Sequence, residues 1–164
     1  MQITIVGYHG QGVRTLSRIL SRAAMLAGLN SQDFSESGNI VKSYVRIGKD
    51  QLEKGPVKNP DMVIILDPAL FSAKDLKENM IFIINTVEKP KSVAKDKNVH
   101  VLDASDIAFK NTGKSVPNTP LAGAMTKYFS KLQIKHVKSA IESELYAKQK
   151  ENSMAAEEGL RLVK

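Results

Sequence analysis

Two short apolar runs constrain the fold of this chain more than any other feature of its sequence. Asp61–Asp67 (DMVIILD) and Met80–Asn85 (MIFIIN) are almost uninterrupted apolar segments, and Pro60, Pro68 and polar residues bound them. A strand with one face in water alternates apolar and polar residues, whereas continuous runs of this length are typical of parallel strands covered on both faces. We therefore expect both runs to lie inside a mostly parallel sheet.

Strand and helix patterns alternate along the first two thirds of the chain, and helical patterns fill the last third. Such alternation predicts parallel strands joined by helical crossovers. We predict one α/β domain over residues 1–164, with a mostly parallel sheet flanked by helices, a Rossmann-like opening and a helical C-terminal third. The other predicted strands are Ile3–Val6, Ile40–Gly48 (one face in water) and Val99–Leu102; the predicted helices are Val13–Ala27, Pro68–Glu78, a turn from Asp103 or Ser105, Thr119–Leu132, Ile134–Lys148 and Glu151–Val163; Glu88–Asn98 and Asn111–Asn118 are predicted loops.

The composition excludes several classes of protein. The chain of 164 residues contains no Cys and no Trp, so it holds no disulfide, no thiol nucleophile and no Cys-ligated zinc or iron–sulfur site. Its longest apolar runs are far shorter than the roughly 20 residues that a membrane-spanning helix needs. The start MQITIVG lacks the basic and apolar regions of a secretory signal. We expect a soluble, cytoplasmic protein with no membrane partner.

The charge of the chain is basic and uneven. Lys and Arg number 24 against 17 Asp and Glu, a net charge of +7. Residues 1–30 hold three Arg without an acid, and Ile107–Ile141 holds six Lys without one. A nucleic-acid binder would combine such charge with clustered aromatics or a groove-entering element, but the four Tyr and five Phe are scattered. We predict no nucleic-acid partner; a solvated face, an anionic ligand and an acidic partner protein all fit the charge.

The glycine-rich segment Gly7–Gly12 (GYHGQG) joins the first predicted strand to the first predicted helix. Backbone N–H groups and the positive end of a helix can bind an anion there. The outer glycines have P-loop spacing, but Val13 stands where that loop has its Lys, which argues against a nucleotide triphosphatase. From Gly10, GQGVRT begins like the dinucleotide-binding GxGxxG, but Thr15 replaces the third glycine. The segment is either an anion-binding turn or a turn needed for close helix packing.

The remaining polar candidates support no complete reaction. Asp33 or Glu36 could bind a ribose as in dinucleotide sites, but one acid in such a window is close to chance. Asp67 ends a buried strand, where α/β proteins bind ligands, although Asp before Pro is also an ordinary turn residue. No Ser elbow, HExxH or GDG motif is present. Surface or capping roles are favoured for His9, His100 and His136, which lack metal-ligand spacing, and a solvated helix face for Lys127, Lys131, Lys135 and Lys138.

Four segments, in order along nearly the whole chain, resemble the gamma subunit of 2-oxoacid:ferredoxin oxidoreductases, the pyruvate synthase family. VGYHGQGVRTLSRILSRAAMLAG resembles the opening strand, GQGV turn and helix of that subunit. SYVRIGKDQL and PVKNPDMVIILDPAL resemble its VRIG strand, PD segment and buried strand. VPNTPLAGAMTKYF resembles its PxxNTxxxGA helix, and ENSMAAEEGLRLV its terminal Asn-x-x-Ala-x-x-x-Gly helix.

The resemblance implies a subunit that is inactive alone and has no catalytic residue of its own. The implied complex converts pyruvate or a related 2-oxoacid and coenzyme A into acyl-CoA and CO2 and reduces ferredoxin. Alpha, beta and delta-type subunits are the implied partners, ferredoxin or flavodoxin the electron acceptor, and thiamine diphosphate, Mg²⁺ and [4Fe–4S] clusters the cofactors held outside this chain. The lack of Cys agrees with this division. A free-standing Rossmann-like nucleotide-binding protein is the alternative.

The resemblance also suggests a ligand-binding rim. The resemblance implies that the gamma part packs beside the thiamine-binding subunits and helps to shape the approach of coenzyme A, and we hypothesise that the glycine loop faces an anion. Two structural roles stand beside this hypothesis: Gly12 is required only for close helix packing, and Asn118 serves only as a helix N-cap. The hypothesised cofactor-binding residues are Gly10, Gln11, Gly12, Arg14 and Thr15, with Asn118 and Thr119 on the same rim.

Overall fold

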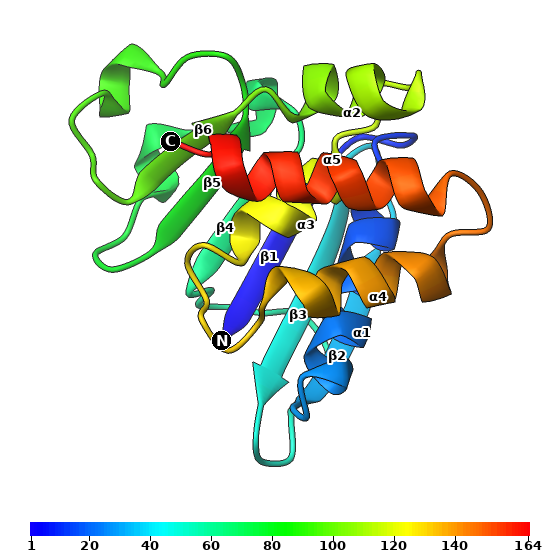
Figure 1. The fold of residues 1–164 in the computed structure, drawn as a ribbon. Helices are drawn as coiled ribbons and strands as arrows, with labels where there is room; N and C mark the ends of the chain where they lie inside the picture. Colours follow the sequence, from blue (N-terminus) through cyan, green and yellow to red (C-terminus); the bar gives the residue numbers. More distant parts are fainter.

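The computed structural model describes residues 1–164 and contains one six-stranded sheet (Figure 1). Its strand order is β2-β3-β1-β4-β5-β6. β1, β4, β5 and β6 run parallel to one another, whereas β3 runs antiparallel to both β1 and β2. The mostly parallel sheet predicted from the sequence is confirmed. The strands are β1 (Gln2–Gly7), β2 (Asn30–Glu36), β3 (Val41–Gly48), β4 (Met62–Ile65), β5 (Ile81–Asn85) and β6 (Val99–Leu102).

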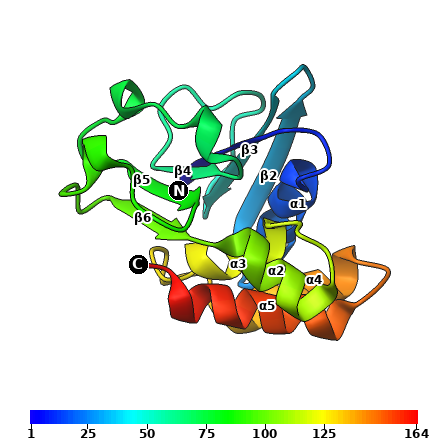
Figure 2. The same ribbon diagram turned by 90° about the horizontal axis from the view of Figure 1, so that it is seen from above.

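The five α-helices lie on one side of the sheet (Figure 2). A core of 29 buried residues fills the space between them and the sheet. On the opposite face a cluster of seven buried residues lies beneath segments that contain only short 3-10 turns. The helices are α1 (Val13–Leu26), α2 (Ala104–Thr112), α3 (Asn118–Met125), α4 (Ile134–Glu144) and α5 (Gln149–Leu162).

The two apolar runs form β4 and β5 and are buried on both faces, as predicted. Ile64 and Ile83 belong to the core beneath the helices, whereas Ile65 and Phe82 belong to the cluster on the opposite face. Adjacent residues of a strand point to opposite faces, so a strand with a core on each side needs an apolar residue at every position. The continuous hydrophobicity of these runs therefore follows from their central place in the sheet.

The predicted helix at Pro68–Glu78 is wrong. This segment forms two single 3-10 turns, Pro68–Leu70 and Ala73–Asp75. Asp67 and Ser72 accept hydrogen bonds from the backbone N–H groups of Ala69 and Lys74, and such local bonds favour short turns over a continuous helix. Leu70, Phe71 and Leu76 of this segment pack onto the sheet, which explains how this face is covered without a helix.

Strand β2 was not predicted, and β3 is more buried than expected. β2 (NSQDFSE) lies at the edge of the sheet and pairs only with β3, so its polar side chains show no clear alternation. One face of this strand was predicted to lie in water, but Tyr44 and Arg46, on the face that alternates with Val45 and Ile47, are buried. The Arg46 guanidinium donates to the carbonyls of Gly55 and Pro56 at 2.5 and 2.8 Å, because the segment after β3 folds back over it.

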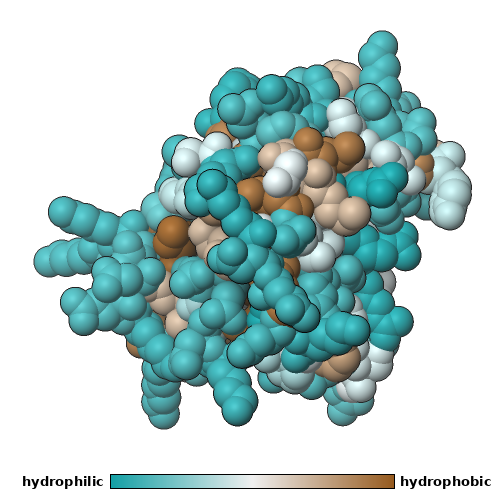
Figure 3. All heavy atoms as spheres, turned by 90° about the horizontal axis from the view of Figure 1, so that it is seen from below, coloured by the Kyte–Doolittle hydropathy of each residue, from teal (hydrophilic) through white to brown (hydrophobic).

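The three C-terminal helices are confirmed, although α3 and α4 end earlier than predicted and α5 begins earlier, at Gln149. α3 ends at Met125, where the Thr126 hydroxyl donates to the carbonyl of Gly123 at 2.7 Å. α2 is a full helix where only a turn was expected. No helix is both long enough and apolar enough to cross a membrane. Viewed from the side opposite to Figure 2, the surface is largely hydrophilic, with groups of apolar residues between hydrophilic side chains (Figure 3).

Candidate functional site

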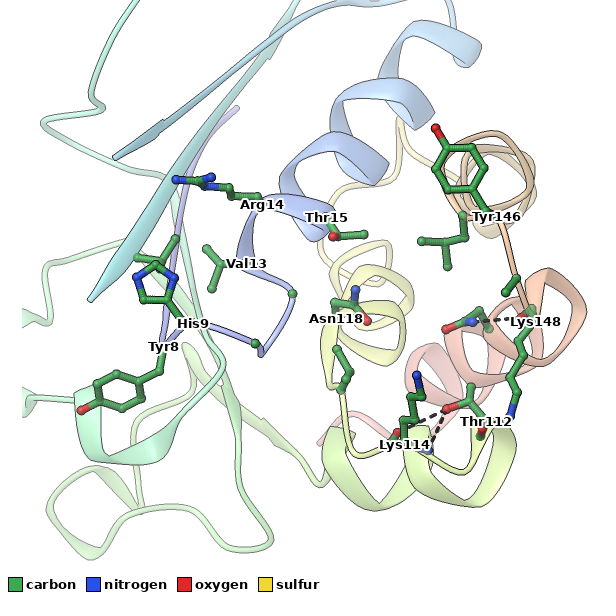
Figure 4. A pocket seen from close by; sticks show the side chains of 17 residues that line it. Tyr8, His9, Val13, Arg14, Thr15, Thr112, Lys114, Asn118, Tyr146 and Lys148 are labelled. Carbon is green, nitrogen blue, oxygen red and sulfur yellow. Dashed lines mark hydrogen bonds between the residues drawn. The ribbon is translucent and has the colours of Figure 1, made fainter. Parts of the chain in front are cut away.

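A cavity of about 650 Å³ opens where β1 ends and α1 begins. One wall consists of the glycine loop, the first turn of α1 and Val41 of β3. The other wall consists of the connection between α2 and α3, the start of α3 and the connection between α4 and α5 (Figure 4). The carboxyl edge of the parallel strands is where open α/β sheets bind ligands. The cavity therefore lies at the expected edge.

The glycine loop needs two residues without side chains. Gly10 and Gly12 have φ angles of +87° and +82°, which lie in the left-handed region that favours glycine. A Cβ atom at Gly12 would also lie 2.6 Å from Nδ2 of Asn118. The proposed packing role of Gly12 is thus supported, and the same close approach brings the loop backbone and the start of α3 to one cavity.

Three α-helices begin at this cavity. α1 follows Gly12, α3 starts at Asn118 and α5 follows Lys148, and these three residues all line the cavity. None of the three helices has a side-chain hydrogen bond at its N-cap. The first N–H groups of a helix carry a partial positive charge and need acceptors. In α3 the N–H of Thr119 is already bonded to Oδ1 of Asn118, and Pro120 has no N–H, so it is the uncapped starts of α1 and α5 that favour an anionic ligand.

The charged side chains that line the cavity are all cationic. Arg14, Lys114 and Lys148 contribute to the lining, and no Asp or Glu does. Arg14 donates to the hydroxyl of Ser37, and Lys148 Nζ donates to the carbonyl of Thr112. All of these cations lack a carboxylate partner, since the five ion pairs of the chain involve other side chains. A cavity lined by one sign of charge concentrates ligands of the opposite sign.

Five of the seven residues hypothesised from the sequence line the cavity, and two lie behind it. Gln11 turns inward: its Nε2 donates to Oδ2 of Asp67 at 3.0 Å, and its Oε1 accepts from the N–H of Tyr8 at 2.8 Å. Thr119 has no exposed surface, and its hydroxyl donates to Oδ1 of Asn152 at 3.0 Å. These two residues hold the loop and α3 in place. The five at the cavity are Gly10, Gly12, Arg14, Thr15 and Asn118.

Asn118 does not have the N-cap role considered for it. The N-cap residue of α3 is Pro117, and Asn118 is the first residue of the helix. Its Oδ1 accepts from the N–H of Thr119 at 2.9 Å. The Asn118 side chain lines the cavity from the start of α3 and approaches the glycine loop at Gly12 (Figure 4).

The sequence did not single out Lys114, Tyr146 and Lys148. Lys114 lies in a predicted loop, and the other two lie in a segment that was predicted to be helical but connects α4 to α5. Lys148 has a φ angle of +53°, which is rare for a residue with a side chain. No local pattern indicates that this connection meets the glycine loop, because α5 is far from α1 in the sequence.

The three His residues have local roles. The ring of His136 accepts from the N–H of Gln133 in the capping box of α4, as the sequence favoured. His9 hydrogen-bonds the carbonyl of Gly38 at 2.9 Å. His100 stacks on Tyr128 with ring centroids 4.1 Å apart, and burial lowers the pKa of His100. No group of three or more His, Cys, Asp or Glu side chains is placed to hold a metal ion.

Comparison with known proteins gives a consistent result along the chain. The sequence model of the family described as pyruvate ferredoxin/flavodoxin oxidoreductase matches residues 2–162. The chain is 32% identical over 149 residues to pyruvate synthase subunit PorC of Thermotoga maritima, covering 83% of this chain and 78% of that one. It is 32% identical over 156 residues to the pyruvate/ketoisovalerate oxidoreductases common subunit gamma of Pyrococcus abyssi, covering 86% and 84%.

Solved structures agree with these relatives. The crystal structure of pyruvate oxidoreductase subunit PORC from Thermotoga maritima superposes with a TM-score of 0.85 at 30% identity, covering 100% of this chain and 97% of that one. A 2-oxoglutarate:ferredoxin oxidoreductase from Magnetococcus marinus, solved with 2-oxoglutarate, coenzyme A and succinyl-CoA bound, gives a TM-score of 0.82. At 15% identity, covering 99% of this chain and 30% of that one, the second match shows the fold alone.

Proposed function

The chain belongs to the pyruvate ferredoxin/flavodoxin oxidoreductase family, and we propose that it is the gamma subunit of a multi-subunit 2-oxoacid:ferredoxin oxidoreductase whose coenzyme A binds in the cationic cavity. The match to PorC and gamma subunits over nearly the whole chain carries the assignment. The complex would oxidise pyruvate or a related 2-oxoacid to acyl-CoA and CO2 and pass the electrons to ferredoxin or flavodoxin. Named relatives act on pyruvate, ketoisovalerate and indolepyruvate, so the assignment is to the class of 2-oxoacids.

The redox and carbanion chemistry of this reaction would reside in the partner subunits. This chain has no Cys, so its residues do not fit a [4Fe–4S] cluster, which needs thiolate ligands. Alpha, beta and delta-type subunits would hold the clusters, thiamine diphosphate and Mg²⁺. The role left for the gamma subunit is to bind and orient the co-substrate and to complete the assembly. A cytoplasmic location stays a prediction from the sequence.

The cavity residues fit the phosphates of coenzyme A. The loop backbone at Gly10 and Gly12 and the uncapped start of α1 offer N–H donors, and Arg14 offers a guanidinium on the same wall. Arginine binds phosphate through two parallel hydrogen bonds. The Thr15 hydroxyl and the Asn118 amide add neutral donors. Coenzyme A held here would supply the thiol that accepts the acyl group.

Reversing the charge of Arg14 tests the assignment. We expect Arg14→Glu, in the assembled complex, to raise the KM for coenzyme A about tenfold or more, because a hydrogen bond to a charged group contributes about 1.5–3 kcal/mol and a carboxylate would repel phosphate. The matched control is Arg22→Glu, since Arg22 is exposed on the same helix but outside the cavity. An unchanged KM and kcat for the Arg14 variant would contradict binding in this cavity.

The alternative, a free-standing Rossmann-like nucleotide-binding protein, fits the sheet less well. In a Rossmann fold the strand after the first helix lies parallel to β1, and the acidic residue for the ribose follows it. Here the chain continues from α1 into the antiparallel β2–β3 hairpin. The carboxylate of Glu36, one of the two acids considered for the ribose, instead accepts from the hydroxyl of Tyr44 at 2.8 Å. The fold therefore lacks the parallel second strand of a dinucleotide-binding site, and Glu36 is not free to bind a ribose.

A further inference from the structure

Lys114 lies on the cavity wall opposite the glycine loop and has no role in the site described above. It follows α2 in the α2–α3 connection, and Figure 4 shows it across the cavity from Arg14. Its side chain is exposed and takes part in none of the ion pairs of the chain. The neighbouring cation, Lys148, is already bonded to a backbone carbonyl. Lys114 is therefore the available cation on this wall.

The backbone of Lys114 is held by a small network. Gly113 ends α2 in the left-handed conformation, with a φ angle of +76°. The buried hydroxyl of Thr112 accepts from the N–H of Lys114 and lies within hydrogen-bond distance of its carbonyl, both at 3.2 Å. Lys148 Nζ, at the start of α5, donates to the carbonyl of Thr112. Because these bonds tie the connection to both α2 and α5, the ammonium of Lys114 projects from a fixed base.

The cavity thus has a cation on each wall, Arg14 beside the glycine loop and Lys114 opposite it, and no Asp or Glu among its lining residues. This arrangement suits a ligand with two separated phosphate groups better than a ligand with one. Coenzyme A has such a pair: the pyrophosphate and, on the ribose, a separate 3′-phosphate. We propose that Lys114 binds the ribose 3′-phosphate and so distinguishes coenzyme A from dephospho-coenzyme A. This proposal rests on the proposed function, in which the pyrophosphate lies at the glycine loop and Arg14.

Comparing the two ligands tests the proposal directly. The Kd values of coenzyme A and dephospho-coenzyme A are measured by calorimetry on the full chain, and their KM values in the assembled complex. We expect the wild-type chain to bind dephospho-coenzyme A about tenfold more weakly. Lys114→Gln should weaken coenzyme A by the same factor, about 1.4 kcal/mol, and leave dephospho-coenzyme A unchanged. Lys114→Arg should restore most of the preference, because both side chains bind phosphate.

A matched control separates this effect from a general loss of positive charge. Lys110→Gln removes a lysine from the same helix end, but Lys110 pairs with Asp106 on the outer surface and does not line the cavity. We expect this variant to keep the preference for coenzyme A. Thermal unfolding of each variant verifies that the fold is intact.

The two hypotheses fail in different ways. If Arg14→Glu leaves coenzyme A binding unchanged, the ligand does not use this cavity, and the proposed function of the site fails with the present proposal. If Arg14→Glu weakens binding while Lys114→Gln has no effect, or weakens both ligands equally, the cavity binds coenzyme A but Lys114 does not bind the 3′-phosphate. Only the loss of discrimination in the Lys114 variant supports the proposal.

Discussion

Gly159 provides a severe test of how the helical layer is built. α3 and α5 cross so closely that a Cβ atom at Gly159 would lie 2.0 Å from the carbonyl oxygen of Pro120, and 2.7 Å from its carbon. The reciprocal contact is equally short, since a Cβ at Gly123 would lie 1.8 Å from the carbonyl oxygen of Ala156. Ordinary van der Waals contact begins at 3.4 Å. Gly159→Ala must therefore separate the two helices by more than 1 Å.

Two opposing effects set the size of the change. Alanine is favoured over glycine inside a helix by about 1 kcal/mol. Overpacking costs about 1–3 kcal/mol, and more where the backbone must move. Here the obstacle is backbone rather than a flexible side chain, and the separation loosens the contacts of buried Leu121 and Ala155. We expect a net loss of about 2 kcal/mol in the free energy of unfolding.

Urea unfolding followed by circular dichroism measures this loss. The variant should unfold at a lower urea concentration with an unchanged m value. Lys150→Ala, at an exposed position of α5, is the control and should change the free energy by less than about 0.5 kcal/mol. If Gly159→Ala stabilised the chain, helix propensity alone would govern this position, and the close crossing of α3 and α5 would be refuted.

Two further predictions concern the polar contacts. Gln11→Ala and Asp67→Ala should each lower the free energy of unfolding, measured in urea, by about 1 kcal/mol. The double variant should lose less than the sum of the two, because the two side chains share one hydrogen bond. Additive losses would show that this bond is not formed. Burial lowers the pKa of His100, so the unfolded chain takes up the proton first as the pH falls, and stability should drop below the ordinary pKa of about 6.5. His100→Gln should reduce that drop between pH 7 and 5, measured by thermal unfolding; an identical pH profile would contradict it.

The parts of the fold that the sequence predicts well are those in which burial acts on every residue of a segment. β4 and β5 lie between two apolar layers, so β4 is apolar throughout and β5 is apolar up to its last residue, Asn85. β2 lies at the sheet edge, where backbone pairing with β3 suffices and its side chains are free to be polar. The composition of Pro68–Glu78 permits a helix, but Asp67 and Ser72 each accept a backbone hydrogen bond as the N-cap of a separate short turn, so no continuous helix forms.

The sequence predicts one wall of the candidate site but not the other. Gly10 and Gly12 need left-handed backbone conformations, and such a local requirement is visible in the sequence between a strand and a helix. Lys114 and Lys148 reach the cavity only because α2 and α5 pack against α3, which contacts α1. These contacts join residues far apart in the chain, so no spacing rule identifies the second wall. Gln11 and Thr119 belong to the right motifs, but their side chains support the site from behind.

The uneven basic charge also becomes intelligible in the fold. The two acid-free segments, residues 1–30 and Ile107–Ile141, each contribute one cation to the cavity, Arg14 and Lys114. Three other lysines of the second segment have partners elsewhere: Lys110 pairs with Asp106, Lys138 pairs with Glu157, and Lys127 donates to the carbonyl of Val163. Because neither segment contains an acid, no carboxylate from the same stretch of chain competes with a phosphate for these two cations. What matters for ligand binding is therefore that Arg14 and Lys114 lie on opposite walls of the cavity. The substitutions at these two positions measure the contribution of each.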